Sequence, residues 1–290
     1  MRGERKSLFL VALFILFLFT GMVVVPSFQA IEFHEGEIDW EQGVITVEGF
    51  GAPPEDKTGA QARLMAQRAA RVDAYRNAAE YIEGIRVNST TTVRDYVVES
   101  DVIQTQVSGF IRGGVFVEIE YSVDDACRAV LQLPIEGQDG LTSFFERSAR
   151  EDAPTLPVAE REQYEPPEEP EREPADHTGI VVDARGLNVE PALYPQIFDT
   201  DGYLLYGPTV VEVDNPELRS LVAYSRSSEK AMEMERLGDN PLLLEASDVV
   251  RREGEAPTDL ILDSNQARQF LEQDQATGLI DRRAVVVIID

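Results

Sequence analysis

A segment rich in proline and glutamate divides the sequence and limits how large any one core can be. It reads "EDAPTLPVAEREQYEPPEEPEREPAD" and covers residues 151–176. The segment has almost no apolar side chain to bury and its carboxylates repel one another, so it predicts an extended linker, which we place at residues 151–177. Residues 31–150 and 178–290 on either side are each long enough for one hydrophobic core, which predicts two domains.

The first thirty residues carry an export signal. Three cations stand among the first six residues, an apolar run follows from Leu8 to Val25, and "PSFQA" comes next. This order is typical of a secretory signal, but the run is also close to the length that spans a bilayer. Residues 1–30 therefore predict either a signal peptide or an uncleaved membrane anchor. In both cases we expect the rest of the chain in the periplasm or at the cell surface, with membrane contact only through this segment.

Charge and cysteine content exclude several classes of protein. The formal net charge is −27 at pH 7, so nucleic acid and anionic membrane surfaces repel the chain. The single cysteine, Cys127, cannot form an intramolecular disulfide. It alternates with Ala129, Leu131 and Leu133, which is typical of the buried face of a strand. We therefore expect no nucleic-acid partner, and domains that fold through their apolar cores alone.

Residues 31–150 predict an α+β domain with helices on one face of a mostly antiparallel sheet. A strand is expected at 43–51, helices at 58–83 and 100–113, a long β-branched strand at 85–98, a hairpin at 115–135 and a short helix at 141–150. Two rows of apolar side chains follow the long helix. One row is Met65, Ala69, Val72, Tyr75, Ala79 and Ile82, and the other is Ala62, Ala66, Ala70, Ala74 and Ala78. The first row predicts the buried stripe, and the alanines predict close approach of another element.

Residues 178–290 predict a smaller α/β domain. Four nearly continuous apolar stretches, "GIVVDA", "PLLLEA", "TDLILD" and "AVVVIID", predict buried strands of a sheet covered on both faces. Helices are expected at 215–223, 225–237 and 264–273. The stretch "QIFDTDGYLLYG" predicts a hairpin, because Asp201 and Gly202 form a strong turn signal.

Three stretches or sets of residues could indicate a chemical site, but none matches the motif of such a site. "GAPPEDKT" at 51–58 approaches a phosphate loop, but Asp56 replaces the second glycine, so a helix-capping turn is expected. His34, His177 and Cys127 do not form a metal-ligand pattern, and "DTDG" at 199–202 lacks the spacing of a calcium loop. We therefore expect no metal, no cofactor and no catalytic constellation.

Asp183, Arg185 and Gly186 are the candidate contact residues for a partner or ligand. They follow a predicted strand, at the carboxyl end where open α/β sheets bind ligands. Residues i and i+2 of an extended chain point to one side, so Asp183 and Arg185 predict either a structural ion pair or a binding site. A catalytic role for Asp183 is the weakest of the three hypotheses.

Several strings carry a family resemblance. They are "AQRAARVDAYRNAAEYIEGI", "VVESDVIQTQVSGFIRG", "TGIVVDARGLNVEPALYPQIFDTDGYLLYG", "NPLLLEA", "TDLILDSNQARQFLE" and "RRAVVVIID". They resemble bacterial envelope proteins of the lipoprotein-20 family and the N-terminal region of flagellar assembly protein T, which builds a ring around the motor's basal body. The resemblance implies an exported, non-enzymatic protein that assists an envelope or flagellum-associated assembly. The chain lacks a lipid-anchoring cysteine, so lipidation is not implied.

We therefore expect a non-enzymatic envelope protein that binds other envelope proteins. The surfaces expected to take part are the helix at 100–113 with the hairpin after it, and the loop after Val182. Two alternatives stay open. One is a periplasmic ligand-binding module that uses Arg185, and the other is a hydrolase of wall glycan or peptide that uses Asp183.

Overall fold

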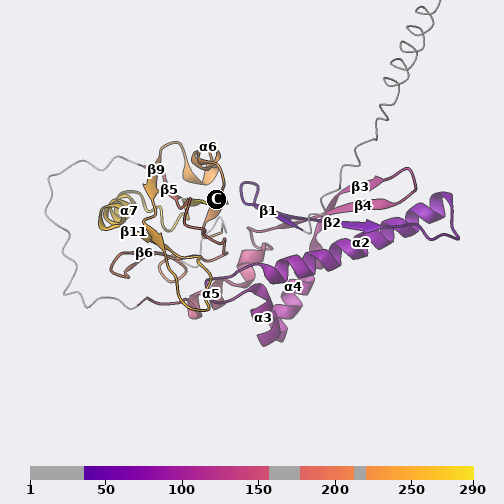
Figure 1. The fold of residues 1–290 in the computed structure, drawn as a ribbon, viewed down its shortest axis with the longest axis horizontal. Helices are drawn as coiled ribbons and strands as arrows, with labels where there is room; N and C mark the ends of the chain where they lie inside the picture. The colour runs from indigo at the N-terminus through magenta and orange to yellow at the C-terminus, as the bar shows by residue number, and fades with distance from the viewer. Residues whose placement is uncertain (1–35, 157–176, 212–219) are drawn as a thin grey trace, which may run out of the picture. The chain divides into compact units, whose positions relative to one another are not determined.

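A computed structural model describes residues 36–156, 177–211 and 220–290 (Figure 1). The predicted signal or anchor, His34, and most of the predicted linker lie outside these residues. Among the described residues, no helix has both the length and the apolar character needed to cross a membrane. Helices and sheets are mixed throughout, as the sequence predicts.

The N-terminal part is built on a four-stranded antiparallel sheet with the order β1-β2-β4-β3. The strands are β1 (Glu37–Asp39), β2 (Val44–Gly51), β3 (Val115–Tyr121) and β4 (Cys127–Pro134). The predicted strand at 43–51 and the hairpin are confirmed, whereas β1 was not predicted. Cys127, Ala129, Leu131 and Leu133 are all buried, which confirms the expected face of β4.

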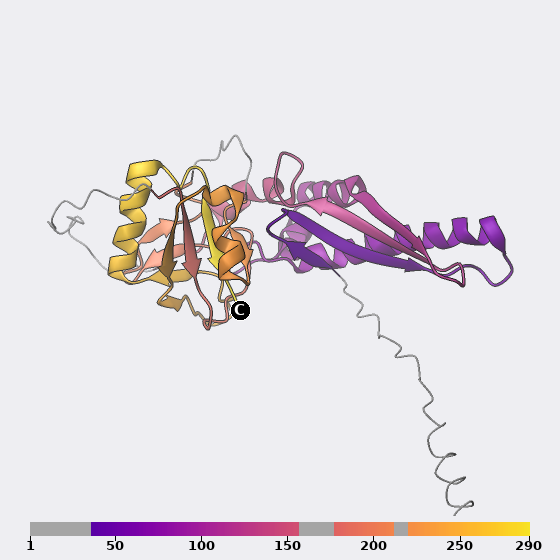
Figure 2. The same cartoon turned by 90° about the horizontal axis from the view of Figure 1, so that it is seen from above.

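Helix α2 (Gly59–Gly84) packs against β2 through its alanines. All five alanines of the i,i+4 row are buried, which confirms the close approach predicted for them. The row of larger side chains is only partly buried: Ile82 is buried and Tyr75 and Ala79 pack against the core, but Met65 is 38% and Val72 is 69% exposed. The cause is close backbone approach: a Cβ added to Gly49 or Gly51 of β2 would lie within 3.0 Å of the helix backbone. Only small side chains fit at this contact. Figure 2 shows α2 behind the strands.

The predicted long strand at 85–98 was wrong. Only Arg86 and Thr92 form a β-bridge, and Val93–Glu99 form helix α3. Local side-chain hydrogen bonds override the β-branched composition. The Asn88 side-chain oxygen accepts from the amides of Thr90 (3.0 Å) and Thr91 (2.9 Å), and Asp95 accepts from the Thr92 amide at 2.7 Å. These bonds make a turn followed by a capped helix start.

Three further helical segments complete the N-terminal part. Helix α4 (Asp101–Gly113) begins at Ser100, as predicted, and buries Val107, Phe110 and Ile111. The expected tail helix is present as a 3₁₀ turn, η1 (Leu141–Phe144), followed by α5 (Glu146–Glu151). Thr58 stands at the start of α2 without a side-chain capping bond.

The C-terminal part contains two sheets where one was expected. A parallel sheet has the order β8-β12-β5-β9, and a mixed sheet has the order β10-β11-β6-β7. The first consists of β5 (Gly179–Asp183), β8 (Ala223–Ser225), β9 (Pro241–Glu245) and β12 (Val285–Ile288). The second consists of β6 (Ile197–Asp199), β7 (Leu204–Tyr206), β10 (Asp248–Val249) and β11 (Leu260–Leu262). The β6–β7 hairpin is the one that the Asp201–Gly202 turn predicts.

The helices of this part agree with the prediction only in places. Helix α7 (Ser264–Thr277) is confirmed, with Asp263 as its cap. The helix expected at 225–237 is broken into α6 (Ser228–Met232) and η2 (Glu235–Leu237), because Met234 between them has extended backbone angles. Residues 212–219 lie outside the described part. Ala223 begins β8, so the end of the helix expected at 215–223 was wrong.

The described residues all belong to one compact unit. The Leu193 amide donates to the Arg86 carbonyl at 2.9 Å, and the Tyr194 amide donates to the Val87 carbonyl at 2.8 Å. The Tyr194 hydroxyl also donates to the Thr142 carbonyl. The two predicted core regions are thus joined by main-chain hydrogen bonds. The boundaries at 150 and 178 stay predictions.

Candidate functional site

The predicted contact residues form a local ion pair at the end of β5. The Arg185 Nε donates to the Asp183 carboxylate at 2.9 Å, and the Arg185 amide donates to the same oxygen at 3.1 Å. The Asp183 side chain is 20% and the Arg185 side chain 49% exposed. Hydrogen bonds from Arg185 hold the pKa of Asp183 below its usual value. Asp183 is therefore ionised at neutral pH, and its acceptor capacity is largely directed to Arg185.

Gly186 completes this loop with a positive φ of 81°. Its amide donates to the Asp290 carboxylate at 2.9 Å and 3.1 Å. This positive φ explains why the residue is glycine, because a residue with a side chain would be strained in the same conformation. The structure thus brings Asp183, Arg185 and Gly186 together, with Asp290 as a fourth member that the sequence did not indicate.

His177, Asp199 and Cys127 were also considered from the sequence, and the structure gives each of them a structural environment. His177 Nδ1 lies 3.2 Å from the Asn240 carbonyl. Asp199 accepts from the amides of Asp201 (2.9 Å) and Tyr203 (2.8 Å), as in a turn. Burial raises the pKa of the Cys127 thiol. Within the described ranges, no group of three or more His, Cys, Asp or Glu side chains is placed to hold a metal ion.

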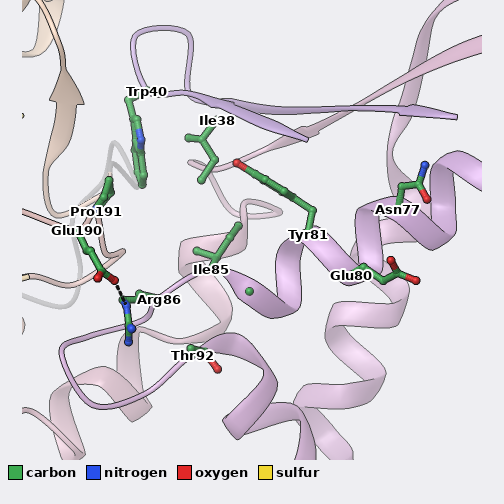
Figure 3. A pocket seen from close by; sticks show the side chains of 11 residues that line it. Ile38, Trp40, Asn77, Glu80, Tyr81, Ile85, Arg86, Thr92, Glu190 and Pro191 are labelled. Carbon is green, nitrogen blue, oxygen red and sulfur yellow. Dashed lines mark hydrogen bonds and ion pairs between the residues drawn. The ribbon is translucent and has the colours of Figure 1, made fainter. Parts of the chain in front are cut away.

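A pocket of about 540 Å³ lies where the β1–β2 hairpin, the end of α2 and the loop before β6 meet (Figure 3). It does not include Asp183, Arg185 or Gly186, and the sequence did not predict it. The lining residues are Ile38, Trp40, Asn77, Glu80, Tyr81, Gly84, Ile85, Arg86, Thr92, Glu190 and Pro191. We call this the Trp40 pocket.

Trp40 is positioned by the turn that joins β1 to β2. The Asp39 carboxylate accepts from the amides of Glu41 (3.0 Å) and Gln42 (2.9 Å), and Gly43 takes a positive φ of 64°. The Trp40 ring meets the Tyr224 ring edge-on, with centroids 5.0 Å apart. This is a favourable arrangement for an aromatic pair, and it holds one wall of the pocket.

Tyr224 also contacts the segment after Glu190 and Pro191, which line the same pocket. Its hydroxyl donates to the Ala192 carbonyl at 3.1 Å and lies 3.1 Å from the Ala192 amide, so it can accept from that group. Ala192 follows Glu190 and Pro191, which line the pocket. Burial raises the pKa of Tyr224, so its proton is retained for this hydrogen bond at physiological pH. The Trp40 wall and the Glu190–Pro191 wall are therefore held by one buried side chain.

Tyr81 and two isoleucines supply further apolar surface. Tyr81 comes from the last turns of α2 and extends towards Ile38, and Ile85 lies below them in Figure 3. Burial raises the pKa of the Tyr81 hydroxyl, and the Glu37 carboxylate adds to the shift. The hydroxyl is therefore neutral at physiological pH.

Polar groups stand at the pocket's edge. Arg86 Nε donates to Glu190 at 2.7 Å, across a separation of 104 residues (Figure 3). The Asn77 side-chain amide donates to the Glu48 carbonyl at 2.9 Å, and Glu80 is exposed. Apolar walls with a few polar groups are typical of binding pockets.

A second pocket, of about 320 Å³, also uses Trp40 as a wall. Its carboxylates come from Glu41, Glu136, Glu233 and Glu235. Arg236 also lines it, is 9% exposed, and donates to Glu136 at 2.8 Å. We call this the acidic pocket. Its lining has more carboxylates than cations.

Part of the chain is similar to a known protein family. The family described as Treponema pallidum Tp0624, second domain, matches residues 179–290. A search of curated proteins found no match. The matched region begins at β5 and includes Glu190, Pro191 and Tyr224, but not Trp40, Tyr81 or Arg86. The similarity therefore covers only one side of the Trp40 pocket.

Proposed function

We propose that this chain is an exported, non-enzymatic envelope protein that acts by binding other envelope proteins. The observation that carries the proposal is the Trp40 pocket, which is lined by Trp40, Tyr81 and Arg86. Tryptophan, tyrosine and arginine are the residue types that dominate binding energy at protein interfaces. Two aromatic side chains in an open pocket are also costly to leave in contact with water unless a partner covers them.

Other features support this proposal. The N-terminal residues have the layout of an export signal, and the chain resembles lipoprotein-20 proteins and the N-terminal region of flagellar assembly protein T. We propose on that basis a role in building an envelope or flagellum-associated structure. We further propose two domains, α+β at 31–150 and α/β at 178–290, joined by the acidic linker.

The non-enzymatic part of the proposal has a physical basis at the hydrolase candidate. Asp183 is ionised and bound by Arg185, so it cannot donate a proton at neutral pH. A glycoside hydrolase needs one protonated carboxyl and a second carboxylate at a set separation. The Arg185 pairing favours a structural role for Asp183.

Photo-crosslinking in native envelopes tests the proposal. A crosslinking amino acid replaces Glu80, which lines the Trp40 pocket, or Glu99 at the end of α3 as a matched exposed control. We expect Glu80 to capture a distinct envelope protein that Glu99 does not capture. The adduct should disappear when Tyr81→Ala is added. Identical adducts from both positions, or none from Glu80, would refute binding at this pocket.

A second candidate function is a ligand-binding module. Its support is the pocket's volume, about 540 Å³, which lies within the roughly 300–1,000 Å³ range of small-molecule sites. Here the test is mass spectrometry of the protein purified from its native host under non-denaturing conditions. A bound small molecule that is absent from the Tyr81→Ala variant supports this function, and a ligand-free protein contradicts it.

A further inference from the structure

Building on the proposed function, we propose that the partner offers the Trp40 pocket a short basic segment. One large apolar side chain of that segment enters the Trp40 pocket, and a lysine or arginine beside it faces the acidic pocket. The partner chemistry is thus a basic peptide segment with an apolar anchor.

The first step is that Trp40 lines both pockets. The two pockets therefore adjoin at Trp40. Successive side chains of an extended peptide point to opposite sides, so neighbouring residues can enter two adjoining pockets. A partner that fills the first pocket brings its adjacent residue to the second.

The second step is the apolar character of the Trp40 pocket. Ile38, Tyr81 and Ile85 face it together with Trp40 (Figure 3). The Arg86 cation at its edge is paired with Glu190 at 2.7 Å. An anionic anchor would have to compete with Glu190 for Arg86 and would lie near Glu80. An uncharged apolar side chain meets neither cost and buries the aromatic surface.

The third step is the charge around the acidic pocket. Glu41, Glu136, Glu233 and Glu235 line the acidic pocket, and its Arg236 is buried against Glu136. The ammonium of Lys230 reaches Glu41 only at 3.9 Å and is 67% exposed, so an incoming cation can replace it. Charge complementarity of this kind selects partners and speeds association.

The fourth step is that a cation gains from the indole as well as from the carboxylates. A lysine or arginine beside a tryptophan face is attracted by the ring's negative potential. A neutral neighbour lacks both attractions, and an acidic one is repelled by the carboxylates and by the net charge of −27. A basic neighbour is therefore the best fit.

Trp40 provides the assay, because it is the only tryptophan in the chain. Three amidated peptides are titrated into the full chain while its fluorescence is recorded: Gly-Lys-Phe-Lys-Gly, Gly-Glu-Phe-Glu-Gly and Gly-Lys-Ser-Lys-Gly. We expect a saturable change with the first peptide only, and weaker binding as salt is added. The double variant Glu233→Gln/Glu235→Gln should weaken binding by about fivefold. The matched control Glu229→Gln, on α6 but outside both pockets, should bind like the unmodified chain.

The outcomes separate this inference from the proposed function. Equal binding of the lysine and glutamate peptides overturns the charge selection, and equal binding of the phenylalanine and serine peptides overturns the apolar anchor. If no peptide changes the Trp40 signal while Glu80 still captures a partner in envelopes, the basic-segment inference fails and the binding function stands. If the crosslinker at position 80 captures no protein, the proposed function fails, and the inference that rests on it fails with it.

Discussion

The close contact between α2 and β2 predicts that a substitution at Gly49 lowers the stability of the protein. Gly49 faces the helix so closely that an added Cβ would overlap the Ala70 carbonyl oxygen and the Ala74 amide nitrogen. Both are backbone atoms of a long helix, so neither can move as a flexible side chain would. Gly49→Ala therefore requires the helix and strand to separate.

The size of the effect follows from that geometry. Restoring an ordinary contact distance moves the helix outwards by roughly 1 Å over the buried alanine row. Overpacking of a close-packed contact costs about 1–3 kcal/mol, and we expect the upper end because backbone has to shift. With a urea slope of about 3 kcal/mol per M, the unfolding midpoint falls by about 1 M.

A second glycine supplies the control. Gly109 lies within α4, is exposed, and has no atom within 4 Å of an added Cβ. Gly109→Ala should stabilise the protein by about 0.5–1 kcal/mol, because alanine loses less backbone entropy in a helix. The same chemical change thus has opposite signs at the two positions. Urea unfolding followed by circular dichroism measures both, and a Gly49→Ala midpoint at or above that of the unmodified chain would refute the close approach.

Three further predictions concern charged side chains. Glu146→Ala removes a partner of Arg283, which is 4% exposed, and should lower the free energy of unfolding by about 3 kcal/mol in urea titrations. Arg185→Ala should change the urea midpoint only a little at neutral pH, because the Arg185 side chain is half exposed and water screens its pair with Asp183. The pKa of Asp183 is lowered in the folded state, so any contribution of this pair is complete above its unfolded pKa of about 3.9. That contribution is lost as the pH falls through the folded pKa, and urea midpoints of the two proteins should converge in acid. Burial raises the pKa of Asp259, so the folded state loses stability as the pH rises through that raised value; urea midpoints should show Asp259→Asn gaining on the unmodified chain as the pH rises above the unfolded carboxyl pKa of about 3.9.

Helices α2 and α4 and the hairpin of the N-terminal part could be predicted because their signals are local. The spacing in α4, its Ser100 cap and the two apolar runs of β3 and β4 lie within short windows. The alanine row of α2 correctly predicted a close approach, but that this row is buried more deeply than the row of larger side chains could not be predicted from α2 alone. The deciding residues are Gly49 and Gly51 on another element, whose missing side chains let the alanine row approach.

The error at 85–98 has a local cause that the sequence contains. Asn88 holds a turn through its side-chain oxygen, and Thr92 with Asp95 forms a capping box. These side-chain hydrogen bonds outweigh the β-branched composition of the segment. A Thr-x-x-Asp pattern before an apolar run was therefore a better guide than β-propensity.

The Trp40 pocket could not be predicted, because its residues are brought together by tertiary contacts. Arg86 and Glu190 lie 104 residues apart, and Trp40 meets Tyr224 from the other part of the chain. The available signal was a lone tryptophan between two acidic residues at a tight turn. The Asp183 hypothesis, by contrast, used i,i+2 spacing and correctly placed Asp183 and Arg185 in contact.

The segment at 85–98, which was wrongly predicted to be a strand, also supplies part of the Trp40 pocket. Ile85, Arg86 and Thr92 line the pocket, while the carbonyls of Arg86 and Val87 accept the amides of Leu193 and Tyr194. The same short stretch therefore shapes the pocket and joins the two parts of the chain. A partner that binds the pocket only while these two parts are in contact must stabilise that contact, by an amount set by the partner's concentration relative to its dissociation constant. Binding at the Trp40 pocket and protection of the Leu193 and Tyr194 amides from hydrogen exchange should thus rise together.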